Sequence, residues 1–254
     1  MVCVGIDIGS SCAKTAVTDG QGNVLWLDQM PTGWSSLDAA EEIRRRLIAA
    51  GFDPEGAPCI ATGYGRVVVP YANKAVTEIT CHAKGAQMLF GLPDFDAIDI
   101  GGQDTKVMCV RNGRVRDFLM NDKCSAGTGR FLEVMANTLG MDSPSMIALS
   151  EQGKDTSISS MCTVFAESEV ISLIGRGETK ANIAYAVVSS IAKKIASQAS
   201  RLCMDNVPTV LTGGLCEADE LRKALGAELG REILSCPEAR YAGAIGAALL
   251  AEKL

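Results

Sequence analysis

The stretch GIDIGSSCAKTAV, residues 5–17, decides the fold. An apolar strand ends at the acidic Asp7, the chain turns at a glycine, and a second strand returns through Lys14. A hairpin of this shape directs backbone N–H groups and the side chains of Ser10, Ser11 and Lys14 toward one point, which suits a polyphosphate. Asp7, at the strand end, is placed to hold a hydrated Mg²⁺. An ordinary β-turn is the alternative that this stretch alone leaves open.

Two further glycine signals follow in the chain. The stretch IDIGGQDTKV (98–107) repeats the plan about ninety residues later, with Asp99 at the strand end and a double-glycine turn. The stretch VLTGGL (210–215) is a buried strand that opens on Gly213 and Gly214, where backbone can lie close to a base or a ribose. Together, two acid-plus-glycine hairpins and one glycine loop predict a nucleotide site with phosphates held by both hairpins.

This combination resembles the superfamily of actin, hexokinase and the heat-shock-chaperone ATPases. The resemblance implies an α/β protein of the actin-like ATPase, or ribonuclease H-like, fold, with two lobes and a nucleotide cleft between them. A P-loop is excluded because no G-x-x-x-x-G-K-[ST] motif occurs. The lobes are predicted at residues 1–92 and 93–254, and the closing helix near 239–254 is a candidate to pack back on the first lobe. Helices are expected after Gly127 at about 129–139, 144–152, 166–174 and 182–204.

The resemblance also assigns roles to individual residues. Asp7 and Asp99 are expected to position Mg²⁺ through water, with Asp104 nearby. Glu78 opens a helix where such proteins place a group near the attacking water, although a glutamate in a first helical turn is also a favourable dipole partner. The predicted phosphate contacts are Ser10, Ser11, Cys12, Ala13, Lys14, Gly101, Gly102 and Gln103, and the predicted adenosine contacts are Gly213, Gly214 and Pro237. Cys12 is interpreted as a small spacing residue rather than a further metal ligand, and His82, the single histidine, as a hydrogen-bonding helix residue.

The composition excludes several other functions. Charged residues make up 21% and hydrophobic residues 47% of the chain, as in an ordinary globular protein. The net charge of −6 argues against nucleic acid as the main partner, because no basic stripe is present to contact phosphates. No apolar run approaches the ~20 residues that span a bilayer. The N-terminus reads as a strand and not as a signal peptide, so a cytoplasmic protein without membrane contact is predicted.

Two of the ten cysteines have unusual settings. Cys124 lies in NDKCSAGTGRFLE (121–133) and Cys162 in SSMCTVFAESEVISLI (159–174), each shortly before a predicted helix. A helix N-terminus favours negative charge and hence the thiolate, which is the form that binds iron–sulfur clusters. Two cysteines cannot close a cube that takes four, but a two-fold dimer supplies the other two. There is no C-x-x-C spacing, and the remaining cysteines are expected to be small buried residues.

These two stretches resemble the activator component of 2-hydroxyacyl-CoA dehydratases, a family that includes the ATPase subunits of benzoyl-CoA reductases. ATGYGR (61–66), TCHA (80–83) and IDIGGQDTK also match, and the similarity runs from Gly5 to about Leu250. The resemblance implies a homodimer with one oxygen-sensitive [4Fe-4S] cluster, for which Cys124 and Cys162 match the ligand positions. It further implies that ATP hydrolysis drives a low-potential electron into a dehydratase or a related iron–sulfur reductase, with a ferredoxin or flavodoxin as donor in an anaerobic organism. Ser11-Cys12 departs from the Thr-Ala common in the family's first loop.

Two other functions remain open at this point. A small-molecule kinase of the same fold, such as a sugar kinase, would need a sugar pocket with a catalytic aspartate and would not need Cys124 and Cys162. A non-catalytic nucleotide sensor would bind ADP without turnover. An ATPase rate and a screen of phosphoryl acceptors would separate these functions from the activator.

Overall fold

The computed structural model describes residues 1–159, 162–202 and 206–254. The chain forms two compact units, each built from separate segments. Unit 1 contains Met1–Phe95, Val110–Arg116 and Glu238–Leu254. Unit 2 contains Asp96–Cys109 and Asp117–Pro237. The C-terminal segment therefore belongs to the same unit as the N-terminus.

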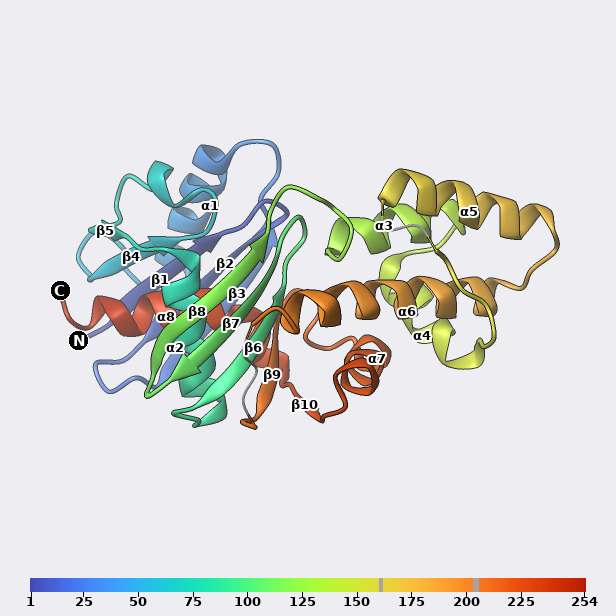
Figure 1. The fold of residues 1–254 in the computed structure, drawn as a ribbon. Helices are drawn as coiled ribbons and strands as arrows, with labels where there is room; N and C mark the ends of the chain where they lie inside the picture. Colours follow the sequence, from blue (N-terminus) through green and yellow to red (C-terminus); the bar gives the residue numbers. More distant parts are fainter. Residues whose placement is uncertain (160–161, 203–205) are drawn as a thin grey trace. The chain divides into compact units, whose positions relative to one another are not determined.

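A mixed sheet forms the centre of unit 1, with the strand order β3-β2-β1-β4-β5 (Figure 1). Its strands are β1 (Cys3–Ile8), β2 (Cys12–Thr18), β3 (Val24–Pro31), β4 (Cys59–Thr62) and β5 (Lys74–Ala75). The pairs β1–β2 and β2–β3 are antiparallel, and the first of them confirms the predicted hairpin in which the chain turns after Asp7 and returns through Lys14. The pairs β1–β4 and β4–β5 are parallel. Every residue of β1 is buried, because β1 is central and both of its faces are covered.

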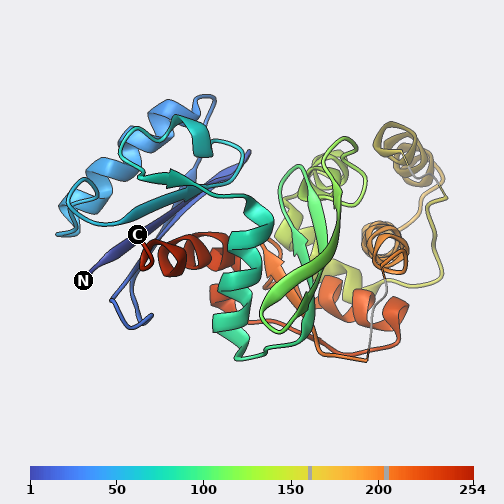
Figure 2. The same cartoon turned by 60° about the vertical axis from the view of Figure 1, so that its left-hand side comes forward.

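Three helices belong to unit 1 as far as the structure describes it: α1 (Ser36–Ala49), α2 (Glu78–Phe90) and α8 (Ala242–Ala251). The side chain of Ser35 caps α1 by accepting a hydrogen bond from the Asp38 N–H at 3.2 Å. Helices α2 and α8 pack directly on one another (Figure 2). Glycines permit this approach, since a Cβ at Gly85 would overlap the carbonyl of Ala242 and one at Gly246 the carbonyl of Cys81.

The sheet of unit 2 repeats the strand order of unit 1. Its order is β10-β9-β6-β7-β8, so a run of three consecutive strands is again followed by two strands added on the other side of the first. The strands are β6 (Phe95–Ile100), β7 (Thr105–Arg111), β8 (Arg114–Asn121), β9 (Thr209–Gly213) and β10 (Ile233–Leu234). Strand β9 is parallel to β6, as β4 is to β1. The ends of β1 and β6 therefore occupy equivalent positions in the two sheets.

Helices make up most of the rest of unit 2. They are α3 (Gly129–Thr138), α4 (Ser143–Leu149), α5 (Thr163–Gly175), α6 (Lys180–Ala199) and α7 (Asp219–Leu229). Helices α3, α5 and α6 lie side by side, and Ile183, Val187 and Ile191 of α6 are in the core beneath them (Figure 1). Short 3₁₀ segments occur at Arg66–Val68, Ser150–Gln152 and Pro237–Tyr241.

Two of the predicted helix limits differ from the structure. The helix predicted to begin at residue 166 begins at Thr163, because the extended backbone of Cys162 already serves as its N-cap and the Cys162 carbonyl accepts the Ala166 N–H at 2.9 Å. The last long helix, predicted to end at residue 204, ends at Ala199 and is followed by a turn at the described residues 200–202, so the predicted end was wrong. In the part of the chain that the structure describes, no helix has the length and apolar character needed to cross a membrane.

Candidate functional site

The acidic strand ends lie at equivalent places in the two units. Asp7 is the fifth residue of β1 and pairs across the sheet with Thr62, while Asp99 is the fifth residue of β6 and pairs with Thr212. Both carboxylates are buried, with 5% and 2% of the residue exposed. A buried carboxylate needs a cation or hydrogen-bond donors, so the partners of each one indicate what the site holds.

The carboxylate of Asp7 is closely surrounded within unit 1. The Nε2 of His82 on α2 lies 3.6 Å from Asp7 Oδ2, and both side chains are almost fully buried. Glycines enclose the carboxylate on two other sides. A Cβ at Gly63 would lie 2.6 Å from Asp7 Oδ1, and a Cβ at Gly243 would lie 2.7 Å from His82 Nε2 and overlap Asp7. Only glycine therefore leaves room beside this carboxylate.

Helix α2 brings a second acidic residue to the same region. Glu78 is the first residue of α2 and is half-buried. It lies one helical turn before His82, so the two side chains share a face. The charge of Glu78 affects the pKa of the buried Cys81 thiol. The pKa of Cys81 is raised to about 12, mainly by burial; a hydrogen bond with Thr62 lowers it, and the charges of Asp7 and Glu78 contribute to the rise.

The carboxylate of Asp99 has a different set of partners in unit 2. The Thr212 hydroxyl donates to Asp99 Oδ1 at 2.9 Å, and the Lys106 ammonium lies 3.3 Å from Asp99 Oδ2. The same ammonium donates to Asp104 Oδ2 at 2.8 Å. The Lys106 side chain is 3% exposed, so this is a buried cation held between two carboxylates. The predicted site residues Asp99 and Asp104 are thus joined through a lysine.

The turns of the two hairpins present the other predicted phosphate contacts. In unit 1 the Gly9 N–H donates to the Cys12 carbonyl at 3.2 Å and closes the turn, leaving Ser10 and Ser11 exposed. Cys12 and Lys14 are half-buried and Ala13 is buried. In unit 2 the Gly101 N–H donates to the Asp104 carbonyl at 2.9 Å, and Gln103 is exposed at the tip. Gly102 is half-buried beside it.

The predicted adenosine contacts lie at the end of β9 and after β10. Gly213 has a φ of +89°, and a Cβ there would lie 2.5 Å from the Ile100 carbonyl oxygen and 2.8 Å from Asp99 Oδ1. Gly214 is exposed with open space beside it, and its N–H donates to the Ile100 carbonyl at 3.1 Å. Pro237 is exposed, and its carbonyl accepts from the Cys216 thiol at 3.9 Å. The loop at Gly213 is therefore part of the surroundings of Asp99.

The two singled-out cysteines lie in neighbouring segments of unit 2. Among the cysteines that the structure describes, Cys124 and Cys162 are the exposed ones, and the others are buried or half-buried. The residues that follow them are joined, since the Ser125 and Thr163 hydroxyls lie 2.8 Å apart. Cys162 is the N-cap of α5. Cys124 lies four residues before the N-cap of α3, Thr128, so the helix-terminus argument applies more directly to Cys162.

Comparison with protein families identifies the chain. The model of the BadF/BadG/BcrA/BcrD ATPase family matches residues 4–251. The chain belongs to this family. The predicted ATPase activity and the predicted actin-like α/β fold class are thereby confirmed.

Three relatives of this ATPase match it over nearly their full length. The (R)-2-hydroxyglutaryl-CoA dehydratase activating ATPase of Acidaminococcus fermentans is 41% identical over 254 residues, covering 98% of this chain and 96% of that protein. The activator of lactoyl-CoA dehydratase of Anaerotignum propionicum is 38% identical, covering 99% and 97%. The activator of the 2-hydroxyisocaproyl-CoA dehydratase from Clostridium difficile, solved with bound ADPNP, has a TM-score of 0.91 at 35% identity, covering 100% and 95%.

The structure of this ATPase adds residues that the sequence analysis did not select. They are Gly63, Lys106, Thr212 and Gly243, and each contacts, or would contact as a larger residue, one of the two buried carboxylates. His82, which the sequence analysis interpreted as a hydrogen-bonding helix residue, lies 3.6 Å from Asp7. A signal for Lys106 was present, because both hairpins contain D-I-G followed by a lysine seven residues after the aspartate. The Gly243 contact had no local signal, because α8 follows β1 by more than two hundred residues.

Proposed function

We propose that this ATPase is an electron-transfer activator that binds one [4Fe-4S] cluster per homodimer. In this function, ATP hydrolysis drives a low-potential electron from the cluster into a 2-hydroxyacyl-CoA dehydratase or a related iron–sulfur reductase. The observation that carries the proposal is the pairing of Cys124 and Cys162, exposed and on segments joined by the Ser125–Thr163 hydrogen bond. Thiolates are the ligands of such clusters, and the cluster when bound supplies one-electron chemistry.

The number of cysteines supports a shared cluster. Within the described residues, no group of three or more histidine, cysteine or acidic side chains is arranged to hold a metal ion. Two cysteines from one chain and two from a second copy on a two-fold axis would supply the four ligands of a cube. Helix α5 beside Cys162 also presents apolar surface, with Val164 66% and Phe165 65% exposed. Apolar surface next to the proposed ligands suits an interface with a second copy.

The nucleotide chemistry is assigned to the hairpins. We expect Asp7 and Asp99 to position Mg²⁺ through water, with Asp104 nearby, and Glu78 to orient the attacking water. His82 and Lys106 hold the two aspartates in place from within their own units, at 3.6 and 3.3 Å. The exposed hydroxyls of the first turn would then contact phosphate oxygens, as donors at a polyphosphate site do.

The relatives support the choice of partner. The proteins that are 41% and 38% identical are named as activators of (R)-2-hydroxyglutaryl-CoA and lactoyl-CoA dehydratases. We therefore propose a dehydratase of this class, or a related reductase, as the electron acceptor. A ferredoxin or flavodoxin is the proposed donor, because the acceptor needs a low-potential electron and both carriers supply one at a time.

Iron analysis of protein purified without oxygen tests the proposal. We expect about four iron and four sulfide per dimer, as in one cube, and an absorption band that dithionite bleaches. Cys124→Ala and Cys162→Ala should each lose the iron, whereas the control Cys236→Ala, a half-buried cysteine away from this pair, should keep it. An iron-free protein that still hydrolyses ATP would overturn the activator proposal. Phosphoryl transfer to a sugar would then identify a kinase.

A further inference from the structure

The phosphate hairpin of unit 2 is hydrogen-bonded to the segment that follows Cys124. The Gly129 N–H donates to the Gly101 carbonyl at 2.9 Å, and the Arg130 N–H donates to the Gly102 carbonyl at 2.7 Å. The Thr105 hydroxyl donates to the Gly127 carbonyl. The first N–H groups of a helix need partners from outside the helix, and here the glycine turn supplies them. The start of α3 is therefore built on the predicted phosphate loop.

Thr105 is the part of this connection that the hairpin itself does not need. The equivalent position in the first hairpin, six residues after the aspartate, is Ala13, which is also buried. The first hairpin thus forms the same turn without a hydroxyl. Thr105 is 1% exposed, and its hydroxyl is committed to Gly127, three residues after Cys124. This hydroxyl serves the link to the cysteine segment, not the folding of the hairpin.

Further hydrogen bonds continue the connection to both cysteines. The Asn121 side chain donates to the carbonyls of Cys124 at 2.8 Å and Ala126 at 3.0 Å, so the backbone around Cys124 is held as one piece. The Ser125 and Thr163 hydroxyls, 2.8 Å apart, connect this piece to the start of α5 and hence to Cys162. All of these residues belong to unit 2. A displacement of Gly127 would therefore reach both cysteine segments.

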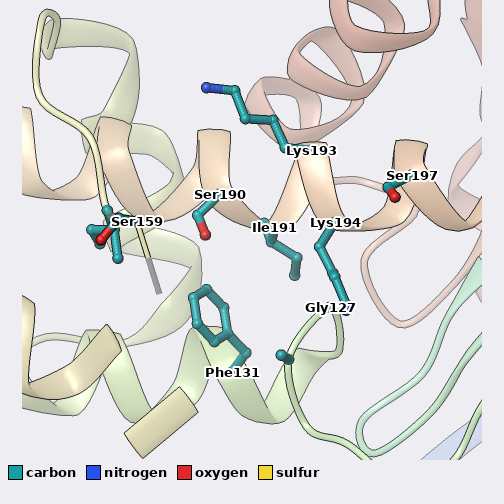
Figure 3. A pocket seen from close by; sticks show the side chains of 10 residues that line it. Gly127, Phe131, Ser159, Ser190, Ile191, Lys193, Lys194 and Ser197 are labelled. Atoms are coloured by element: carbon teal, nitrogen blue, oxygen red, sulfur yellow. The ribbon is translucent and has the colours of Figure 1, made fainter. Parts of the chain in front are cut away.

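The Gly127 segment adjoins open volume. It lines a cavity of about 300 Å³ together with Phe131, Ile191 and Lys194 (Figure 3). In Figure 3 the Phe131 ring and the Ile191 side chain point toward this space from opposite helices. Close-packed interiors resist displacement, so a segment that adjoins open volume changes position more readily than one packed on all sides.

We propose that Thr105 is a positioning residue that couples the nucleotide state of the Gly101–Asp104 turn to the segments of Cys124 and Cys162. A nucleotide that binds one position of this turn more tightly than another shifts the population of the turn, and the hydrogen bonds to Gly127, Gly129 and Arg130 carry the shift to the start of α3. The inference rests on the proposed function in assigning the Gly101–Asp104 turn to the nucleotide and the two cysteines to a cluster. The coupling itself needs no cluster.

Hydrogen–deuterium exchange on the full-length protein tests the coupling, with ADP and ADPNP compared. The informative peptide spans residues 121–131, which contains the bonded amides of Gly129 and Arg130. In the wild type we expect exchange of this peptide to differ at least threefold between the two nucleotides. Thr105→Val removes the hydroxyl and keeps the shape, and should abolish the difference, while Thr105→Ser should restore it. ADPNP affinity, measured by calorimetry, should stay within about threefold in both variants.

A matched control removes another hydroxyl from the same helix. The Thr138 hydroxyl on α3 donates to the Val134 carbonyl at 3.0 Å and to Glu167 Oε1 on α5 at 3.3 Å. Neither acceptor belongs to the hairpin, so Thr138→Val should keep the full nucleotide response. The proposal is overturned if wild-type exchange is the same with both nucleotides, if Thr105→Val responds like the wild type, or if Thr105→Val loses nucleotide affinity more than tenfold. Iron content is measured separately on the same preparations. Absence of iron with a normal exchange response would refute the proposed cluster and leave the coupling standing.

Discussion

Replacing Lys106 by methionine tests how much stability unit 2 loses when the buried carboxylate of Asp99 has no counter-charge. The Lys106 ammonium lies 3.3 Å from Asp99 and 2.8 Å from Asp104, and its side chain is 3% exposed. Methionine keeps the volume of the stem but removes the charge. The Asp104 side chain is 27% exposed and is readily solvated by water, whereas the Asp99 side chain is 2% exposed and gains much less solvation when the ammonium is removed. Removing one partner of a buried pair costs about 3–5 kcal/mol, so we expect unit 2 to lose that much stability.

Urea unfolding of nucleotide-free protein measures this loss. Both tryptophans, Trp26 and Trp34, lie in unit 1, so their fluorescence reports on that unit. Far-ultraviolet circular dichroism follows the helices of unit 2 and is the signal that should shift. The double variant Lys106→Met/Asp99→Asn should recover at least about 1 kcal/mol relative to Lys106→Met alone, because a neutral amide needs no counter-charge. A loss below 1 kcal/mol, or a double variant no more stable than Lys106→Met, would refute the argument.

Two other predictions concern stability. Gly246→Ala places a methyl group against the Cys81 carbonyl of α2 and should cost at least about 1–3 kcal/mol of stability. The control Gly175→Ala has open space around it and should be neutral or stabilising by up to about 1 kcal/mol. Equal melting temperatures for the two variants would contradict the packing argument. Burial raises the pKa of the Cys59 thiol from 9.0 to about 12. The unfolded chain therefore loses this proton first, and stability should fall by up to about 1.4 kcal/mol per pH unit between pH 9 and pH 12. Urea titrations between pH 9 and pH 12 measure this slope of the unfolding free energy against pH. The same slope in a Cys59→Ala variant would count against the assignment to Cys59.

The hairpins were predictable from the sequence because their signals are local. An apolar strand, an acidic residue and a glycine turn within about ten residues determine both the backbone path and the place of Asp7 and Asp99. The same reasoning placed Cys124 and Cys162 before helices. The start of α5 was missed by three residues, because no proline, glycine or capping hydroxyl marks position 162.

The partners of the carboxylates were not predictable in the same way. His82 reaches Asp7 only because α2 packs on α8 and beside β1, which depends on glycines at 85, 243 and 246. Sequence spacing carries no information on such a crossing. Strand β5 has two residues, too few for any alternation to be visible. Lys106 of the second hairpin could have been predicted as a site residue only by aligning the two hairpins, which places it opposite Lys14.

The helix that follows the third strand starts differently in the two units. In unit 1 the helix after the third strand, α1, starts on its own cap, the hydroxyl of Ser35. In unit 2 the equivalent helix, α3, has no capping bond from its N-cap side chain, and its first N–H groups donate instead to the carbonyls of Gly101 and Gly102. The start of a self-capped helix does not depend on the position of the hairpin beside it. The start of a helix whose first N–H groups are bonded to the hairpin changes position with the hairpin. The duplicated fold therefore contains one unit whose helix start is hydrogen-bonded to its glycine turn, and that is the unit where Cys124 and Cys162 lie.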